Sequence, residues 1–238
     1  IVRDAAALCP QARIFNYANP MTANCLGVVR ETGVTVTGLC HGTWHTEAGL
    51  AEFAGLPRSE VSSLAVGLNH LTFLFDFRHQ GADAWPLVRE RLAVAGDMPA
   101  ADPFCWELFR AHGAFPAPGD RHVTEFFPER FPGGRYQGKV LGIDAFSFER
   151  TIEMGDAIHE EVMALARDTG APAPEVYAPA VGEHEQLMDI IDSLETDRRG
   201  VFSVNLPNRG AIAGLRDDAV LELPAAATAR GFMPLAVR

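Results

Sequence analysis

Four short segments of this 238-residue chain contain residue types that could carry chemistry. They are Asn16–Met21 (NYANPM), Gly38–Gly42 (GLCHG), Gly67–Phe73 (GLNHLTF) and Gly119–Pro128 (GDRHVTEFFP). Cys40 offers a thiolate and His70 an imidazole, and both ligand types bind divalent transition metals. One thiolate and one imidazole are too few for a closed structural site, so such a pair would leave the open positions that a catalytic metal needs.

Each segment also has a plain structural alternative. Asn19 offers a donor and an acceptor to sugar hydroxyls, but Asn-Pro is also a common turn. Cys40 and His41 could be a buried cysteine and a capping histidine. Asn69 and His70 interrupt an apolar run and need partners, because an unsatisfied buried polar group costs about 1–3 kcal/mol.

The fourth segment is a charged loop framed by proline and glycine. It could be a solvated turn. We expect instead that its sequence Phe126-Phe127-Pro128 anchors it in the core, so that its charged side chains line a wall.

The composition is that of a globular protein, with 47% hydrophobic and 21% charged residues. A net charge of −11 argues against partners that are nucleic acids or anionic membranes. No apolar run reaches the length of a membrane span. The four cysteines are scattered, so we expect a cytoplasmic protein with reduced thiols in which Cys9, Cys25 and Cys105 belong to the core.

The elements around the first two segments alternate between strand and helix. The patterns predict strands at Ala12–Tyr17 and Val34–Leu39, and helices at Thr22–Glu31 and Thr46–Ala54. This alternation is typical of a parallel α/β sheet, in which ligands bind beyond the carboxyl ends of strands. Asn19 and Cys40 follow such ends. No GxGxxG turn is present, so residues 1–62 are predicted to be the end of a Rossmann-like domain.

Residues 63–238 follow a different pattern. They predict an α+β domain for substrate and metal. Within Leu64–Phe77, the apolar and aromatic run Leu71–Phe77 suits a strand packed on both faces, and Phe115–Gly134 is expected to be a loop with short helical pieces. The further expected elements are helices at Trp85–Ala95, Pro103–His112, Ile152–Thr169 and Glu185–Thr196, and strands at Val201–Asn205 and Ala219–Leu223. The fold class is therefore α/β, and we expect the chain to be incomplete at both ends.

Taken together and in this order, the four segments resemble glycoside hydrolase family 4, the glycosidases that use NAD and a divalent metal. The stretches Val204–Ile212 and Val220–Pro224 are similar to the C-terminal pattern of the family. The resemblance covers nearly the whole chain. Each motif is weak by itself, whereas the ordered set is specific.

The resemblance implies a role for several positions. Cys40 and His70 match the two protein ligands of the catalytic metal, usually Mn²⁺. Asn19 and Asn69 match positions that contact the sugar, and Asn16 is expected to contact the NAD cofactor. The partner is then a small-molecule glycoside, and a homodimer or homotetramer is expected.

The family reaction begins with hydride transfer from sugar carbon 3 to NAD, which makes the proton on carbon 2 acidic. The aglycone then leaves by elimination, water adds, and the hydride returns. The resemblance implies that Asp120 is the base that removes the proton and that His41 is the leaving-group acid or proton shuttle. Some relatives use a tyrosine as the base, and Tyr136 is the alternative here.

The Cys-His pair and the GDRH sequence look most like the branch that acts on α-uronides. A uronate carboxylate needs a cation, and Arg121 or His122 is expected to supply it or to contact the substrate. Because the glycine-rich turn is missing, this chain by itself is expected to bind NAD weakly or not at all.

Other classes of function remain open from the residues. One is an NAD-linked dehydrogenase of related fold, which would accumulate NADH instead of releasing a sugar. Another is a non-catalytic remnant that serves as a sugar-binding or oligomerisation module. A cysteine hydrolase using Cys40 and His41 is disfavoured, because adjacent residues of a strand point to opposite faces.

Overall fold

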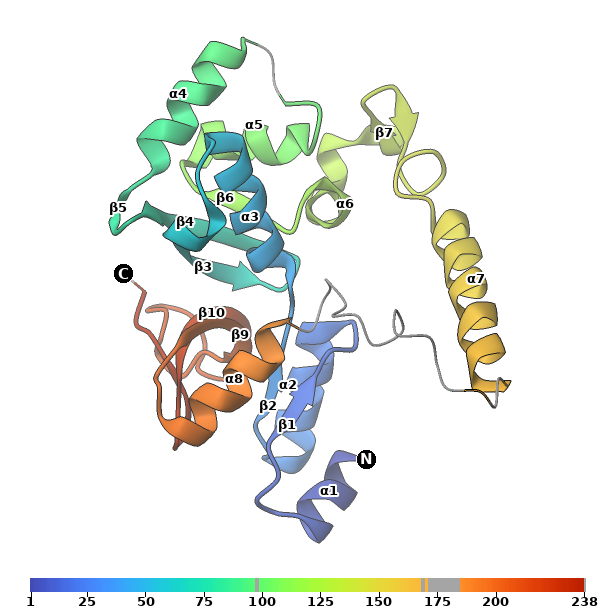
Figure 1. Ribbon diagram of the computed structural model, residues 1–238, viewed down its shortest axis with the longest axis vertical. Coiled ribbons are helices and arrows are strands. Elements are labelled where there is room, and N and C mark those ends of the chain that lie inside the picture. Colours follow the sequence, from blue (N-terminus) through green and yellow to red (C-terminus); the bar gives the residue numbers. More distant parts are fainter. Residues whose placement is uncertain (97–98, 168–169, 171–184, 238) are drawn as a thin grey trace. The chain divides into compact units, whose positions relative to one another are not determined.

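The computed structural model describes residues 1–96, 99–167, 170 and 185–237 (Figure 1). The chain divides into two compact units, residues 1–123 with 183–238 and residues 124–182. The first unit contains the large sheet, and the second contains short turns, a small hairpin and one long helix. Our division of the chain at residue 62 stays a prediction.

The first unit begins with the predicted alternation. Its elements are α1 (Val2–Leu8), β1 (Ile14–Asn16), α2 (Met21–Thr32), β2 (Val36–Gly38) and α3 (Gly42–Ala54). Strands β1 and β2 pair in parallel, as the pattern predicted. Helices α2 and α3 end at Gly33 and Gly55, whose φ angles of 70° and 72° are left-handed and therefore suit glycine.

The sheet joins strands that are far apart in the sequence. The remaining strands of this unit are β3 (Val61–Leu68), β4 (Leu71–His79), β5 (Ala82–Asp83), β6 (Phe115–Ala117), β9 (Val201–Pro207), β10 (Val220–Thr228) and β11 (Gly231–Pro234). The order is β1-β2-β9-β10-β3-β4-β5, with β11 on β10 and β6 on β4. All these further pairs are antiparallel, so β9 and β10 continue a parallel pair into a mixed sheet.

Two helices bury the apolar faces of this sheet. Helix α2 packs Met21 and Cys25 against Val36 of β2 and Val220 of β10. Helix α8 (Glu185–Thr196) packs against strands β9 and β10 through the following buried cluster: Ile190, Leu194, Val204, Leu206 and Ala225. Figure 1 shows these helices, α2 in blue and α8 in orange, beside β1, β2 and β9.

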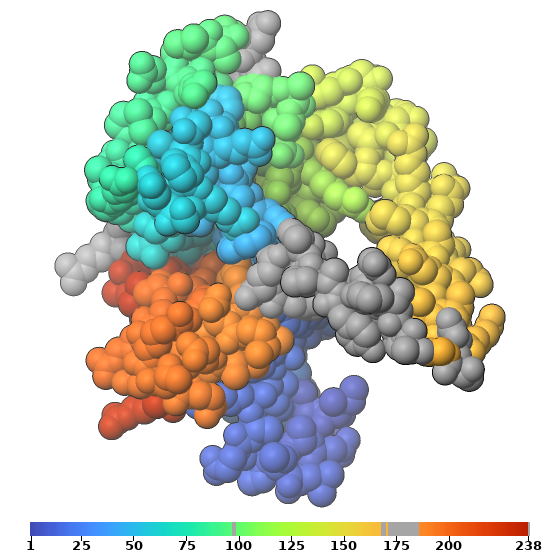
Figure 2. All heavy atoms as spheres, in the orientation of Figure 1, coloured from blue at the N-terminus to red at the C-terminus, as the bar shows by residue number. Residues whose placement is uncertain are grey.

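The cysteine prediction is confirmed at two positions and wrong at one. Cys25 and Cys105 are buried, whereas Cys9 is exposed. Cys9 ends α1, a helix with no buried residue, which Figure 2 shows standing out from the rest of its unit in dark blue. A cysteine in such a helix has no core to enter.

The predicted strand over Leu71–Phe77 is confirmed as part of β4, but the prediction that Asn69 and His70 interrupt a continuous strand is wrong. The stretch Leu64–Phe77 is a hairpin of β3 and β4, and Asn69 and His70 form its two-residue turn. The apolar run hid the reversal, because both strands are rich in hydrophobic residues. His70 has a φ of 68°, a left-handed conformation that histidine adopts more readily than most residues.

The helices after the hairpin form where the sequence predicted them. Helices α4 (Trp85–Ala95) and α5 (Pro103–His112) have the expected bounds, and a 3₁₀ turn, η1 (Arg58–Glu60), precedes β3. Trp106 of α5 contacts Phe53 of α3 and Phe115 of β6, with ring centroids 4.5 and 4.7 Å apart. The start of the fourth segment therefore rests on an aromatic cluster.

The predicted anchor of the fourth segment is wrong. Phe126 is exposed, whereas Asp120, Val123 and Thr124 are buried. The segment contains a short helix, α6 (Asp120–Val123), and a 3₁₀ turn, η2 (Thr124–Phe126). Asp120 and Val123 hold it at its beginning, so the wall lies at Asp120 and not at the two phenylalanines.

The second unit consists of short elements and one helix. They are η3 (Pro128–Arg130), η4 (Pro132–Gly134), β7 (Arg135–Tyr136), β8 (Lys139–Val140) and α7 (Phe148–Arg167). The predicted helix over Ile152–Thr169 starts four residues earlier than expected, and its last two residues lie outside the described residues. Among the described residues, no helix is long and apolar enough to cross a membrane.

The hairpin gives the first testable prediction. A Cβ at Gly67 would collide with the Leu71 carbonyl oxygen and lie 2.9 Å from the Thr72 Cα. We expect Gly67→Ala to destabilise the protein by about 1–3 kcal/mol, the usual cost of overpacking. Urea unfolding measures this change.

Gly27 provides the matched control. It lies inside α2, and a Cβ there would meet nothing within 4 Å. Gly27→Ala should stabilise the protein by about 0.5–1 kcal/mol, since glycine inside a helix costs conformational entropy. Equal effects of the two substitutions would refute the packing argument.

Candidate active site

Cys40 lies between the end of β2 and the start of α3, in a position that favours a thiolate. The backbone N–H of Gly42 donates to its Sγ at 3.4 Å. Helix α3 begins directly after it, and the N-terminus of a helix stabilises negative charge. Cys40 is partly exposed and lines a small hollow with Tyr17, His41 and Ser203. Its surroundings therefore suit a metal-binding sulfur.

The second predicted metal ligand, His70, faces another histidine. The rings of His70 and His122 have centroids 4.1 Å apart, with an interplanar angle of 35°. Burial lowers the pKa of His122, and the nearby charges of Arg121 and His41 lower it further. The contact between the His70 and His122 rings therefore brings the third and fourth segments together.

Gly42, two residues after Cys40, lies close to the ring of Pro118. A Cβ at Gly42 would lie 2.6 Å from the Cβ of Pro118 and 3.4 Å from the Cys40 Sγ. Glycine is therefore needed where the GLCHG segment meets the loop before Asp120. His41 also contacts His45, one turn along α3, with centroids 4.9 Å apart.

Asn69, the predicted substrate contact beside His70, is held by a buried carboxyl. Its Nδ2 donates to Glu222 Oε2 at 3.2 Å. Sequence reasoning gave Glu222 no role, although a glutamate inside the apolar strand sequence VLELP was a signal that a buried acid needs polar partners.

Asn16 and Asn19 make local contacts. Asn16 Nδ2 donates to the Ala18 carbonyl at 2.9 Å and lies 3.1 Å from the Met21 sulfur. Asn19 Oδ1 accepts the backbone N–H of Met21 at 3.2 Å, which caps the first turn of α2. Asn19 is exposed beyond β1. The cofactor contact of Asn16 and the sugar contact of Asn19 stay predictions.

Asp120, the predicted base, faces the protein interior. Its Oδ2 and Oδ1 accept the backbone N–H groups of Phe104 and Cys105, each at 2.8 Å, and the side chain is 0% exposed. These N–H groups belong to the first turn of α5, so Asp120 caps this helix. The backbone N–H of Asp120 in turn donates to Asp102. The structure therefore gives Asp120 a structural task, and its role as base stays a prediction.

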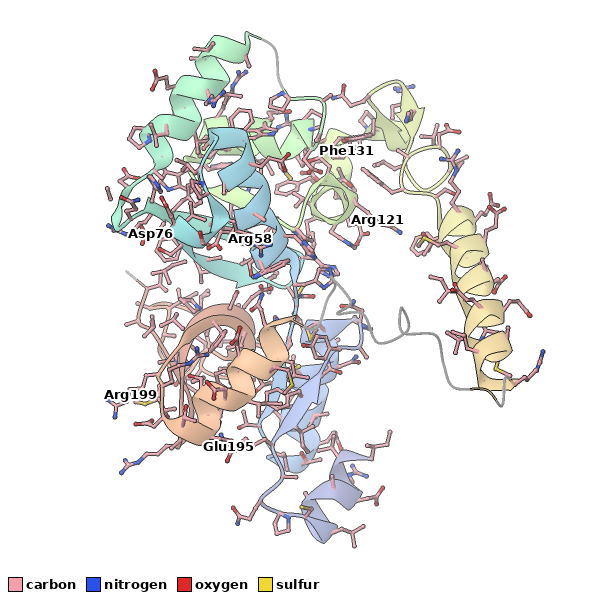
Figure 3. The ribbon with its side chains drawn as sticks, in the orientation of Figure 1. Arg58, Asp76, Arg121, Phe131, Glu195 and Arg199 are labelled. Carbon is pink, nitrogen blue, oxygen red and sulfur yellow. The ribbon has the colours of Figure 1, made fainter. Side chains whose placement is uncertain are left out.

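The neighbours of Asp120 are more accessible. Arg121 is exposed on α6, where Figure 3 labels it, and His122 is half-buried. Tyr136, the alternative base, belongs to β7 of the second unit and packs between the rings of Phe131 and Phe146.

The donor set fits a catalytic metal with open positions. Within the part of the chain that the structure describes, no group of three or more His, Cys, Asp or Glu side chains could hold a metal ion. The predicted pair of Cys40 and His70 needs no third protein ligand, because substrate oxygens or water would complete the coordination. The ligand assignment stays a prediction.

Comparison with protein families settles the class of this chain. A model described as "Family 4 glycosyl hydrolase" matches residues 1–56, and one described as "Family 4 glycosyl hydrolase C-terminal domain" matches residues 65–238. The chain therefore belongs to glycoside hydrolase family 4, as its motifs suggested.

The curated relatives carry several substrate names. An α-galacturonidase of Bacillus subtilis is 28% identical over 98% of this chain and 55% of its own length. An α-galactosidase of Bacillus subtilis is 24% identical over 98% of this chain and 53% of its own length. An α-glucosidase of Erwinia rhapontici is 28% identical over 97% of this chain and 55% of its own length. The chain thus spans about half the length of these relatives.

Solved structures confirm the predicted fold class. The putative glucosidase lplD of Bacillus subtilis has a TM-score of 0.76 and 25% identity, and covers 98% of this chain and 57% of its own. A 6-phospho-α-glucosidase from gut microorganisms, solved with NAD and Mn²⁺, has a TM-score of 0.73 at 18% identity over 99% and 55%. Malate dehydrogenase of Plasmodium falciparum shares the fold with a TM-score of 0.51 at 12% identity over 100% and 60%.

The capping role of Asp120 predicts a loss of stability on substitution. We expect Asp120→Ala to destabilise the protein by about 1–3 kcal/mol, because two buried N–H groups lose their acceptor. The measurement is urea unfolding followed by circular dichroism.

Asp83 gives a matched comparison. Its exposed carboxylate accepts the backbone N–H of Trp85 at 3.0 Å at the start of α4. Water can replace this acceptor, so Asp83→Ala should cost roughly 0.5–1 kcal/mol, the lower part of the range for helix caps. If Asp120→Ala cost no more than this, its buried cap would contribute little.

Proposed function

We propose that this chain carries the metal-binding and substrate-binding residues of a glycosidase that hydrolyses α-uronides. The observation that carries the proposal is the contact between the rings of His70 and His122, which come from the third and fourth segments and have centroids 4.1 Å apart. Imidazoles suit metal and proton chemistry, and the Cys40 thiol of the second segment lies between the end of β2 and the start of α3.

Cys40 and His70 would hold the divalent metal. The N–H from Gly42 and the start of α3 stabilise the thiolate form of Cys40 that a metal requires. When bound, the metal would supply Lewis-acid polarisation of the sugar, and NAD would supply the hydride acceptor. Asn69, next to His70, would orient the sugar hydroxyls.

Proton transfer is assigned to the side chains around these ligands. His41 would protonate the leaving group, since it adjoins Cys40 and is partly exposed. Asp120 would act as the base only in an arrangement in which one carboxylate oxygen turns from the first turn of α5 toward the sugar. Tyr136 is the second candidate for this step.

Arg121 would bind the uronate carboxylate. It is exposed beside His122, and a guanidinium can bind a carboxylate through two parallel hydrogen bonds. His122 has a lowered pKa, so it is neutral at pH 7 and is the weaker choice of cation. Several relatives are named α-galacturonidases, which supports this substrate class.

An NAD-linked dehydrogenase is the second candidate function. It is supported by the fold that this chain shares with malate dehydrogenase. Product analysis separates the two activities. A glycosidase releases free sugar and returns its hydride, whereas a dehydrogenase accumulates NADH. A binding module without catalysis would bind its sugar equally well in the presence of a chelator.

Metal binding is the first test of the proposal. We expect the chain to bind Mn²⁺ in calorimetric titration, and Cys40→Ser and His70→Ala each to weaken binding by about tenfold or more, the order of effect seen around metal sites. Cys25→Ser is the control, because this thiol of α2 is buried in the core against the sheet. Unchanged Mn²⁺ affinity in both ligand variants would refute the assigned metal site.

Uronate binding is the second test. With Mn²⁺ present, we expect D-galacturonate to bind more tightly than D-galactose, and Arg121→Ala to weaken only galacturonate, by about tenfold or more for a lost charged hydrogen bond. Arg110→Ala, an exposed arginine of α5, is the control. If Arg121→Ala bound galacturonate as tightly as the parent protein, Arg121 would not be the carboxylate ligand.

A further inference from the structure

A buried glutamate sits at the centre of a polar row that crosses the sheet. In successive strand pairs, Gly38 lies opposite Asn205, Asn205 opposite Glu222, and Glu222 opposite Gly67. Gly67 in turn lies opposite Thr72. Opposed residues point to the same face of a sheet, so the polar side chains of this row share one face.

The carboxyl of Glu222 links this row to the neighbour of one predicted metal ligand, His70, and to a residue of the hollow that the other, Cys40, lines. Its Oε2 lies 3.2 Å from Asn69 Nδ2, which directly precedes His70, and its Oε1 lies 3.0 Å from Ser203 Oγ. Ser203 lines the same small hollow as Cys40. The side chain of Glu222 is 1% exposed, so it touches no substrate and acts only through its neighbours.

The contacts of the Thr72 hydroxyl bear on whether the Glu222 carboxyl is protonated. The Thr72 hydroxyl lies 2.9 Å from the Leu68 carbonyl oxygen and 3.0 Å from Glu222 Oε2. A hydroxyl has one proton and the Leu68 carbonyl has none to donate. If Oε2 carries a proton, both contacts are ordinary two-centre hydrogen bonds, in which Glu222 donates to Thr72 and Thr72 donates to Leu68.

The surroundings of Glu222 agree with an uncharged acid. The described side chains that hydrogen-bond to it, namely Asn69, Thr72, Ser203 and Asn205, are uncharged. A buried carboxylate without a cation is costly, and burial raises the pKa of Glu222. The protonated form avoids that cost and satisfies the hydroxyl of Thr72.

We propose that Glu222, as an uncharged acid, is the positioning residue that holds the turn of Asn69 and His70 and couples it to the Cys40 hollow. Such support matters here, because His70 has a φ of 68°, a left-handed conformation that a non-glycine residue keeps only when its surroundings impose it. The effect on metal binding rests on the proposed function, whereas the position of the turn does not depend on it.

Two substitutions test the position and the charge of this side chain. Glu222→Ala should move the imidazole NMR signals of His70 and His122 in the metal-free protein and weaken Mn²⁺ binding by about tenfold or more, as loss of an outer partner does. Glu222→Gln should preserve both readouts, because a neutral amide can donate to Thr72 and accept from Ser203. The second N–H of the introduced glutamine would donate to the Asn69 side-chain oxygen, once the Asn69 amide has rotated by half a turn.

Glu60→Ala is the matched control. Glu60 precedes the first strand of the same hairpin, at the end away from the turn, and accepts hydrogen bonds from His79 and Gln80 at 2.9 and 2.7 Å, but it is exposed. Its loss should leave the His70 signals and Mn²⁺ affinity unchanged. Thr72→Val removes only the hydroxyl that lies between Glu222 and Leu68. It should change the His70 signals and the Mn²⁺ affinity in the same direction as Glu222→Ala, and it replaces Glu222→Ala if that variant does not fold.

The outcomes separate this inference from the proposed function. Unchanged His70 signals in Glu222→Ala and Thr72→Val would overturn the positioning role. A loss in Glu222→Gln equal to that in Glu222→Ala would overturn the uncharged state. Absence of Mn²⁺ binding in the parent protein would overturn the proposed metal site alone, since the NMR readout of the turn needs no metal.

Discussion

The candidate site depends on one tight reversal of the chain, the turn of Asn69 and His70 between β3 and β4. Gly67 permits it, because no Cβ fits beside the Leu71 carbonyl. The reversal brings the His70 ring to within 4.1 Å of the His122 ring and turns the Asn69 amide onto Glu222. A straight strand, as the apolar run suggested, would carry His70 and Phe73 onward in one direction and separate the third segment from the others.

The same site relies on buried carboxyls that have structural tasks. Asp120 accepts two N–H groups at the start of α5 and thereby fixes α6, which carries Arg121 and His122. Glu222 joins β9, β10 and the hairpin turn through neutral donors. Both acids are buried, so an acid in this fold can support the candidate site without touching the substrate.

Much of the local structure could be predicted from the sequence. The bounds of α4 and α5, the parallel pair of β1 and β2, and the short helical pieces after Phe115 follow from periodicity and from glycine and proline. The family could be predicted from four ordered motifs, and the family models confirm it. The exposure of Cys9 and Phe126 could not be predicted, because the hydrophobicity of a residue does not show whether its helix or loop packs against a core.

The sequence by itself determined the family, the alternation of early strands and helices, and which residue types are available for metal and proton chemistry. Only the tertiary structure decided that the rings of His70 and His122 meet, that Asp120 faces α5, and that β9 and β10 lie between β2 and β3. The reason is physical. Residue patterns report local backbone preference and burial, whereas strand order and the direction of a polar side chain depend on partners more than a hundred residues away, as Glu222 and Asn69 illustrate.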